Sequence, residues 1–363
     1  MLQDIDLREL SQMQGNGRDF VSVYFRGEDG IESLRSRERM LRAMLEEMPD
    51  EAEHFDMSMQ LVHELLEKHP VRAEGVCVFA CALLDFVRGY PLSMPVPNEL
   101  RVGPSPYIRP LAELQDEYQT FALVACDNSA TRIFLVTNHQ AELEDQIKGG
   151  VKNHVKKGGW SQKRYSRRRE NQLHRYAGEV VDALAQLVNE HGLERIVLTG
   201  SEETMREIKD ELPEDLAQKV VGQEAFDLNR SEGELLDAAY EAYFAEEIEF
   251  EQKLWERIKN EYQRHGLAVT GATDVLDAFR TGRVETAIVT TDAQLRGTQC
   301  RDCEWVVHGT PKTCQQCGSK SVFELDLVDV FAKQAELTSS RVEFSDPIAG
   351  LSKVGGVAAL LRY

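Results

Sequence analysis

Four of the seven cysteines form a pattern that constrains the fold of the last third of the chain. Their spacing is Cys300-x2-Cys303-x10-Cys314-x2-Cys317. Each C-x-x-C turn brings two thiolates to one side of a tetrahedral ion, so the spacing predicts a structural Zn²⁺ knuckle with these four ligands. Two disulfides or a redox pair are the alternatives. A reducing compartment disfavours the disulfides, and a redox pair needs only one C-x-x-C.

The remaining cysteines and the composition indicate a cytoplasmic protein. Cys77, Cys81 and Cys126 lie in apolar runs, where a thiol behaves as a small hydrophobe, so we expect them in the core. Hydrophobic residues make up 42% and charged residues 29%, as in soluble globular proteins. The longest apolar run, residues 76–84, is too short to span a bilayer, and the first residues do not resemble a secretory signal. We therefore expect no membrane partner.

Length and proline distribution divide the chain. Its 363 residues exceed the size at which a single core stops growing. Six of the eleven prolines lie between Gly89 and Pro110, which excludes helix there and predicts extended segments ending in a linker. Strands and helices alternate along the chain, so the predicted class is α/β (α+β). Three domains are expected: an N-terminal α/β domain (1–110), a central mixed-sheet domain (111–265), and a C-terminal α/β/α domain (266–363) with the knuckle inserted at about 294–321.

Apolar periodicity predicts the individual elements. Strands are expected at 19–25, 75–87, 120–126, 130–137, 195–199, 267–271, 286–292 and 357–363. Helices are expected at 31–48, 51–68, 202–211, 231–264 and 273–281. A strand followed by a helix is expected within 322–336. A further helix is expected to end at a Gly192 C-cap. Ser231 and Glu234 have the spacing of a capping box for the long helix.

A strongly basic segment runs from Lys148 to Arg175. Ten lysines and arginines against one glutamate give it a net charge of +9 in 28 residues, on a chain whose total is -20. Like charges this close repel unless a polyanion neutralises them, and nucleic acid is the natural polyanion. Gly158-Gly159 lets the backbone approach a ligand, while Trp160, Tyr165 and Tyr176 supply stacking surfaces. The alternative is a basic surface loop docked by Trp160.

The same segment resembles a known motif. The stretch KKGGWSQKRYSRRRE (156–170) resembles the G-G-Q-S-x-x-R-F-x-R loop of the archaeal and eukaryotic class 1 peptide chain release factors. Residues 265–292 resemble the opening of that family's third domain, which is L30e-like, and GGVAALLRY resembles its closing G-G-I-A-A-I-L-R-Y. Archaeal members carry a comparable cysteine knuckle. The resemblance covers nearly the whole chain, and Trp160 at the glutamine position is typical of a divergent bacterial or archaeal homologue in this Pelota-related superfamily.

The resemblance implies a peptidyl-tRNA hydrolase whose Gly-Gly loop enters the ribosomal A site. Backbone N–H groups can position a water and face the developing oxyanion, so no catalytic triad is required. Catalytic roles are implied for Gly158 and Gly159, with either the Trp160 backbone amide or Gln162, in a bulged loop, replacing the family's glutamine; loss of catalysis is the third alternative. The residues expected to contact RNA are Lys156, Lys157, Ser161, Lys163, Arg164, Arg167, Arg168 and Arg169.

The resemblance is weakest where the family reads codons. The N-I-K-S motif has only a loose counterpart in residues 33–36 (SLRS), so we expect rescue or quality control rather than stop-codon decoding. The alternatives are a non-catalytic ribosome-binding rescue or hibernation factor, and an RNA-binding protein unrelated to the ribosome. Expected partners are rRNA, peptidyl-tRNA and, because the chain has no phosphate-binding G-x-x-x-x-G-K-[ST] loop, a separate translational GTPase. DNA is not expected.

Overall fold

The structure is a computed structural model. It describes the chain except residues 1, 3–4, 16, 28–29, 70–72, 138–139, 149–159 and 226–231. Two compact units are present: one combines Met1–Glu117 with Glu251–Tyr363, and the other is Tyr118–Phe250. In the described part of the chain, no helix is long and apolar enough to cross a membrane. The division into three domains at residues 110 and 265 stays a prediction.

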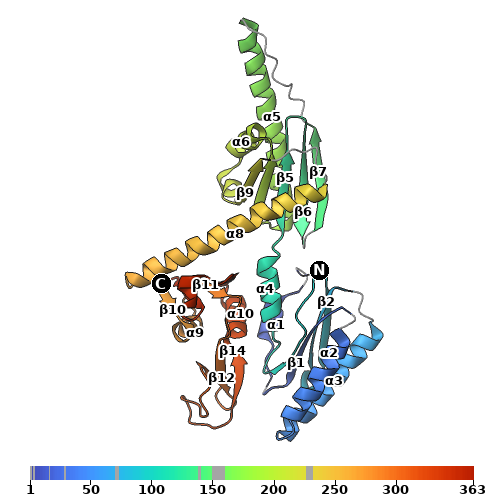
Figure 1. The fold of residues 1–363 in the computed structure, drawn as a ribbon, viewed down its shortest axis with the longest axis vertical. Coiled ribbons are helices and arrows are strands. Elements are labelled where there is room, and N and C mark those ends of the chain that lie inside the picture. The colour runs from blue at the N-terminus through green and yellow to red at the C-terminus, as the bar shows by residue number, and fades with distance from the viewer. Residues whose placement is uncertain are drawn as a thin grey trace. The chain divides into compact units, whose positions relative to one another are not determined.

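The first block of the larger unit is an antiparallel sheet with helices on one face (Figure 1). Its elements are α1 (Leu7–Gln12), β1 (Phe20–Arg26), α2 (Gly30–Met44), α3 (Pro49–Lys68), β2 (Gly75–Cys81), the 3-10 turn η2 (Ala82–Leu84), β3 (Phe86–Leu92), β4 (Glu99–Gly103) and α4 (Arg109–Glu117). The strand order is β3-β2-β1-β4. Leu34 of α2 and Phe55 of α3 pack on Val23 and Val78, which fixes both helices to one face of the sheet.

The proline-rich stretch is extended over most of its length. Pro91 lies in β3, an edge strand, where proline is tolerated. The prediction that residues 89–110 contain no helix was wrong at the end of this range. Helix α4 begins at Arg109 and includes Pro110 in its first turn. The N–H groups of a first turn have no intrahelical partner, so a proline there costs no hydrogen bond.

The last block of the larger unit is a second four-stranded sheet between helices, the expected α/β/α arrangement. Its elements are the end of α8 (Glu232–Gln263), β10 (Ala268–Thr270), α9 (Ala272–Arg280), β11 (Val284–Thr290), α10 (Leu327–Thr338), β15 (Arg341–Ser345), α11 (Ala349–Ser352) and β16 (Val357–Leu361). The strand order is β10-β16-β11-β15. Phe279 and Phe331 of α9 and α10 lie in one core cluster, whereas Trp255 and Ile258 of α8 lie in another.

A small antiparallel sheet is inserted into this last block. It consists of β12 (Arg296–Cys300), β13 (Val306–His308) and β14 (Val322–Asp326), in the order β13-β12-β14. The cysteine pattern begins at the end of β12 and finishes before β14, so this sheet positions the predicted knuckle.

The smaller unit is a five-stranded mixed sheet with helices on both faces. Its elements are β5 (Phe121–Cys126), β6 (Ala130–Thr137), β7 (Gln140–Lys148), α5 (Trp160–His191), β8 (Ile196–Gly200), α6 (Glu202–Glu211), α7 (Glu214–Ala217), β9 (Val220–Ala225) and the start of α8. The order is β7-β6-β5-β8-β9, and β5, β8 and β9 are parallel. Alternate residues of β5 face opposite cores: Val124 packs with α5 and α6, and Leu123 packs with Tyr243 of α8.

The structure confirms the α/β class and the burial of Cys77, Cys81 and Cys126. Gly192 has a φ of 62° and follows the last residue of α5, as expected of a C-cap glycine. Among the described strands, five were not predicted: β7, β9, β12, β13 and β15. The described side chains of β7 are mostly exposed and several are acidic, which suits a sheet edge but leaves no apolar alternation to detect. Ser231 lies outside the described residues.

Candidate functional site

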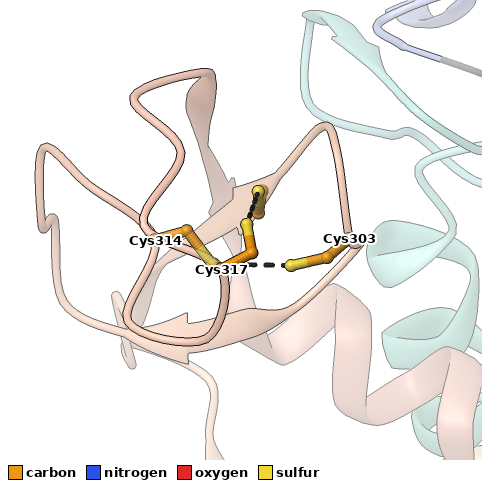
Figure 2. A group of neighbouring side chains, drawn as sticks. Cys303, Cys314 and Cys317 are labelled. Carbon is orange, nitrogen blue, oxygen red and sulfur yellow. Dashed lines mark hydrogen bonds between the residues drawn. The ribbon is translucent and has the colours of Figure 1, made fainter.

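The four knuckle cysteines come together in the structure (Figure 2). Their sulfur atoms all lie within 4.8 Å of one another. The Cys300–Cys317 and Cys303–Cys314 sulfur pairs are each 3.5 Å apart. A tetrahedral zinc ion with bonds of about 2.3 Å places its sulfur ligands about 3.8 Å apart. The four thiolates therefore lie within metal-binding distance and fit a tetrahedral ion.

Local backbone donors favour the thiolate form of one ligand. The N–H groups of Cys317 and Gln316 donate to the Cys314 sulfur, the latter at 3.3 Å, and lower the pKa of this thiol to about 6. The pKa values of the neighbouring Cys303 and Cys317 thiols are raised instead, so these donors favour the thiolate at Cys314 alone.

The knuckle has little apolar core of its own. Cys300 and Cys314 are buried, but Cys303 and Cys317 are exposed. On one side, the Arg280 guanidinium of α9 lies 3.8 Å from the centre of the Trp305 ring and donates to the Val306 carbonyl at 2.5 Å. The knuckle therefore has little buried apolar surface to hold its turns together.

The predicted catalytic residues lie at and before the start of α5. Lys156, Lys157, Gly158 and Gly159 fall outside the described residues. The helix begins at Trp160, and its first turns contain Ser161, Gln162, Lys163 and Arg164, whose backbone alone is described. The Gly-Gly pair is thus followed directly by a helix N-terminus, where the first N–H groups have no intrahelical partner.

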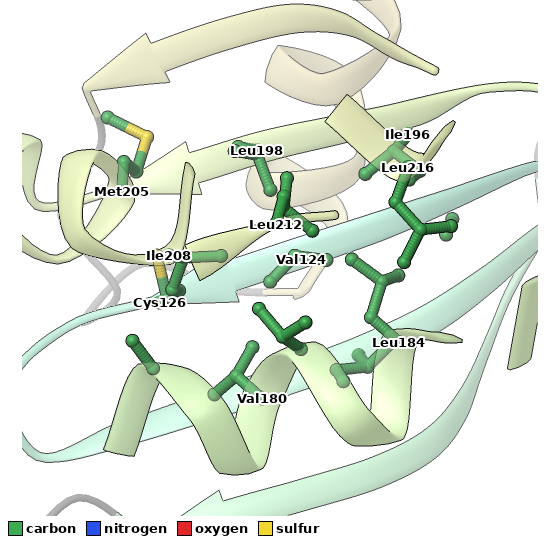
Figure 3. Packing of buried hydrophobic residues seen from close by; sticks show 14 of the residues in the cluster. Val124, Cys126, Val180, Leu184, Ile196, Leu198, Met205, Ile208, Leu212 and Leu216 are labelled. Carbon is green, nitrogen blue, oxygen red and sulfur yellow. The ribbon is translucent and has the colours of Figure 1, made fainter. Parts of the chain in front are cut away.

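The second half of α5 is fixed to its sheet (Figure 3). Val180 and Leu184 are fully buried and pack with Val124, Leu198 and Ile208 of the sheet and α6. These contacts recur every three or four residues from Leu173 onward, as expected for the buried face of an amphipathic helix. The basic first turns therefore extend from an anchored helix.

The described arginines of α5 differ in their surroundings. Arg167 and Arg168 are exposed. Arg169 is largely buried and forms an ion pair with Glu203 of α6, which raises the pKa of the guanidinium through their hydrogen bond. Arg167 and Arg168 are thus available to a partner, whereas Arg169 already has a carboxylate.

The expectation that Tyr176 offers a stacking surface was wrong. Its side chain is 4% exposed and lies in the core, and its hydroxyl is 2.6 Å from the Thr131 Oγ1. The spacing of three residues from Leu173 and four to Val180 puts Tyr176 on the buried face of α5, and this signal was present in the sequence.

The loose counterpart of the codon-reading motif lies inside a helix. Residues 33–36 fall in the first turns of α2, and Leu34 is buried against the sheet. The described structure therefore presents this stretch as part of a packed helix and not as a loop tip.

Sequence reasoning missed a second group of metal-type donors. On the facing surfaces of α5 and α6, the His174 Nδ1 lies 2.7 Å from a Glu211 oxygen and 3.7 Å from a Glu207 oxygen. The four-residue spacing of the two glutamates was visible, but their partner lies on another helix. All three are at least partly exposed, and their contacts link α5 to α6.

The fold and site define a class: a multi-domain α/β protein with a cysteine knuckle and a basic helix start. The family model described as bacterial archaeo-eukaryotic release factor family 10 matches residues 106–243. Peptide chain release factor subunit 1 of Methanocaldococcus jannaschii is 23% identical over 98% of this chain and 96% of its own length. The protein of the same name from Archaeoglobus fulgidus is 27% identical over 71% of this chain and 69% of its own length. The chain is thus similar to archaeal peptide chain release factors over nearly its whole length, and its middle third matches a release-factor family model.

Solved structures give more distant matches. The archaeal translation termination factor aRF1 aligns with 100% of this chain and 97% of its own, at 13% identity and a TM-score of 0.28. Dom34 of S. cerevisiae, a translation termination-like factor, aligns with 76% of this chain and 73% of its own, at 12% identity and a TM-score of 0.41. Both TM-scores are low, so the similarity to release factors rests on the sequence matches.

Proposed function

We propose that this protein is a ribosome-associated factor that hydrolyses the peptidyl-tRNA ester in the A site, in rescue or quality control. The observation that carries the proposal is the Gly158-Gly159 pair, placed directly before the basic N-terminus of α5 in a release-factor-related chain. The partners are rRNA and peptidyl-tRNA, and a separate translational GTPase supplies any nucleotide-driven step. Such a role is cytoplasmic.

The chemistry needs little from side chains. Ester hydrolysis requires a positioned water and donors that face the developing oxyanion or the leaving 3′-oxygen. Glycines allow the backbone to reach the ester where a Cβ would clash. The helix start adds N–H groups at Trp160 and after it, and its dipole favours negative charge. Either the Trp160 backbone amide or Gln162 replaces the glutamine of the release-factor G-G-Q-S loop.

The knuckle has a structural role in this proposal. Cys300, Cys303, Cys314 and Cys317 bind Zn²⁺, and four thiolates leave no coordination position for a catalytic water. The ion holds the two turns together at the edge of the last block. The chemistry therefore belongs only to the basic segment from Lys148 to Arg175, which we call the arm.

The test is peptide release from ribosomes that carry peptidyl-tRNA, with a vacant A site, a sense codon or a stop codon. Rescue predicts release that is insensitive to the codon. Release only at stop codons would instead assign a decoding role, and no release under any condition would contradict hydrolysis.

A non-catalytic ribosome-binding factor is the second candidate, and Trp160 at the glutamine position favours it. In that case Trp160 stacks on RNA and the ester stays intact. Co-sedimentation with ribosomes in the absence of release would support this candidate. Equal affinity for free RNA and for ribosomes would point to a general RNA-binding protein instead.

A further inference from the structure

The knuckle also contacts the first block of the larger unit, through an arginine that lies between two of the proposed metal ligands. Arg301 follows Cys300 directly and precedes Cys303 by two positions. Its guanidinium forms an ion pair with Glu51, in the first turn of α3. It also lies 5.4 Å from the centre of the Phe323 ring. One side chain therefore connects the metal turn to the first block.

Glu51 is an unusual partner because it is buried. Its side chain is 9% exposed, and it also accepts a hydrogen bond of 2.8 Å from the Arg18 Nε. Burial raises the pKa of this carboxyl, but Arg301 and Arg18 outweigh burial and hold the pKa below its ordinary value. Glu51 is therefore a buried carboxylate between two cations, and removing a partner leaves charge that is less well compensated.

The place of Arg301 depends on the shape of the turn. The Arg301 N–H donates to the Ser321 carbonyl at 2.9 Å, and the Glu304 N–H donates to the Cys300 carbonyl at 2.9 Å. Residues 302–304 are exposed and contribute no core. Cys300 and Cys303 lie on either side of Arg301. An ion bound to their thiolates therefore fixes the direction of the Arg301 side chain.

We propose that the metal-bound knuckle is a clamp: ligation at Cys300 and Cys303 holds Arg301 against Glu51 and so secures the first block to the last block. This inference rests on the zinc site proposed above, but not on ester hydrolysis. The clamp couples metal occupancy to the stability of the first turn of α3, which contains none of the ligands.

A second set of contacts between the two blocks does not involve the knuckle. Asp329 of α10 accepts hydrogen bonds from the Ile108 and Arg109 N–H groups at 2.7 and 3.1 Å. Arg109 pairs with Asp326 at 3.0 Å. Because these contacts join α4 to α10, they remain when the metal leaves. The clamp therefore predicts a local response around Glu51 and not a general separation of the blocks.

The experiment is hydrogen exchange with mass spectrometry on the full-length protein, zinc-loaded and after chelation. Metal loss should speed exchange in peptides covering residues 48–58 by roughly tenfold, the factor expected when a charged hydrogen bond is lost. Peptides covering α4 and α10 should change little. Arg301→Ala should give the same increase with zinc still bound, Arg301→Lys should restore part of the protection, and Arg296→Ala, an exposed arginine on β12, is the matched control.

Two results would overturn the clamp. One is an increase confined to residues 294–322 after chelation, and the other is an Arg301→Ala variant that exchanges like the wild type. Metal content is measured on the same samples, so a chain that takes up no zinc would refute the metal site and the clamp together. None of these readouts uses ribosomes, and peptide release is therefore judged separately.

Discussion

The cysteine knuckle and the basic arm are both short of apolar core, but they are held in opposite ways. In the knuckle, four sulfur atoms converge on one point, and Arg280 and Arg301 connect the surrounding turns to other elements. In the arm, α5 is anchored through its second half, while Arg167 and Arg168 are exposed and form no ion pair with the described residues. The knuckle thus brings all of its candidate metal ligands together within the chain. The proposed function of the arm instead requires groups that a partner supplies.

Removing the ion tests the knuckle side of this comparison and should have the largest effect. Cys314→Ala should abolish stoichiometric zinc binding and unfold residues 294–321 locally, because structural zinc contributes roughly 10–16 kcal/mol in small zinc-finger peptides. Zinc content and the thermal midpoint are the measurements. Cys126→Ala, at a buried cysteine of the smaller unit, is the control and should keep its zinc. A Cys314→Ala protein with a full zinc equivalent would refute the four-thiolate site.

Weakening the packing that anchors α5 tests the arm side of the comparison. Leu184 is fully buried in the core under this helix. Leu184→Ala should lower the free energy of unfolding of the smaller unit by about 2–5 kcal/mol, through lost transfer energy and a residual cavity. Denaturant titration measures it, with Leu83→Ala, at a half-exposed leucine, as the control. An unchanged midpoint for Leu184→Ala would mean that this half of α5 does not anchor the arm.

Neutralising the exposed arginines should have a smaller effect, confined to the proposed ribosomal partner. Arg167→Gln with Arg168→Gln should weaken ribosome binding about tenfold and reduce the slope of log affinity against log salt by roughly 1–2, because each phosphate contact contributes close to one unit. Arg206→Gln, at an exposed arginine of α6, is the matched control. An unchanged salt slope would place the RNA contact elsewhere.

The smallest effect is expected at Tyr176. Tyr176→Phe removes the hydroxyl that lies 2.6 Å from Thr131 and should cost about 0.5–1.5 kcal/mol of stability. Ribosome binding should stay unchanged, because the ring is in the core. A loss of ribosome affinity without a loss of stability would reverse this assignment.

Local patterns in the sequence predicted most of the fold and the clustering of four cysteines. The cysteine spacing was sufficient for this because all four residues fall within a few positions of two turns. The end of α5 followed from Gly192, which is a local signal. Strand β7 could not be found in this way, because an exposed, charged edge strand carries no apolar alternation.

The remaining features depend on partners far away in the sequence. Composition placed Arg169 among the RNA-binding cations, but only the packing of α5 on α6 shows that Glu203 faces it. Likewise, the sequence around Glu51 and around Arg301 contains no pattern that indicates their ion pair. Tyr176 is a different case, because its helical spacing from Leu173 already indicated burial.

The central claim is that the Gly-Gly pair before α5 acts on the ester, and a glycine substitution tests it most directly. Wild-type and Gly159→Ala proteins are compared for peptide release and for co-sedimentation with ribosomes carrying peptidyl-tRNA. The account predicts at least about a hundredfold loss of release, the usual effect of removing one oxyanion donor, with binding largely retained. Wild-type protein that binds ribosomes and releases no peptide, or a Gly159→Ala variant that releases peptide at the wild-type rate, would contradict it.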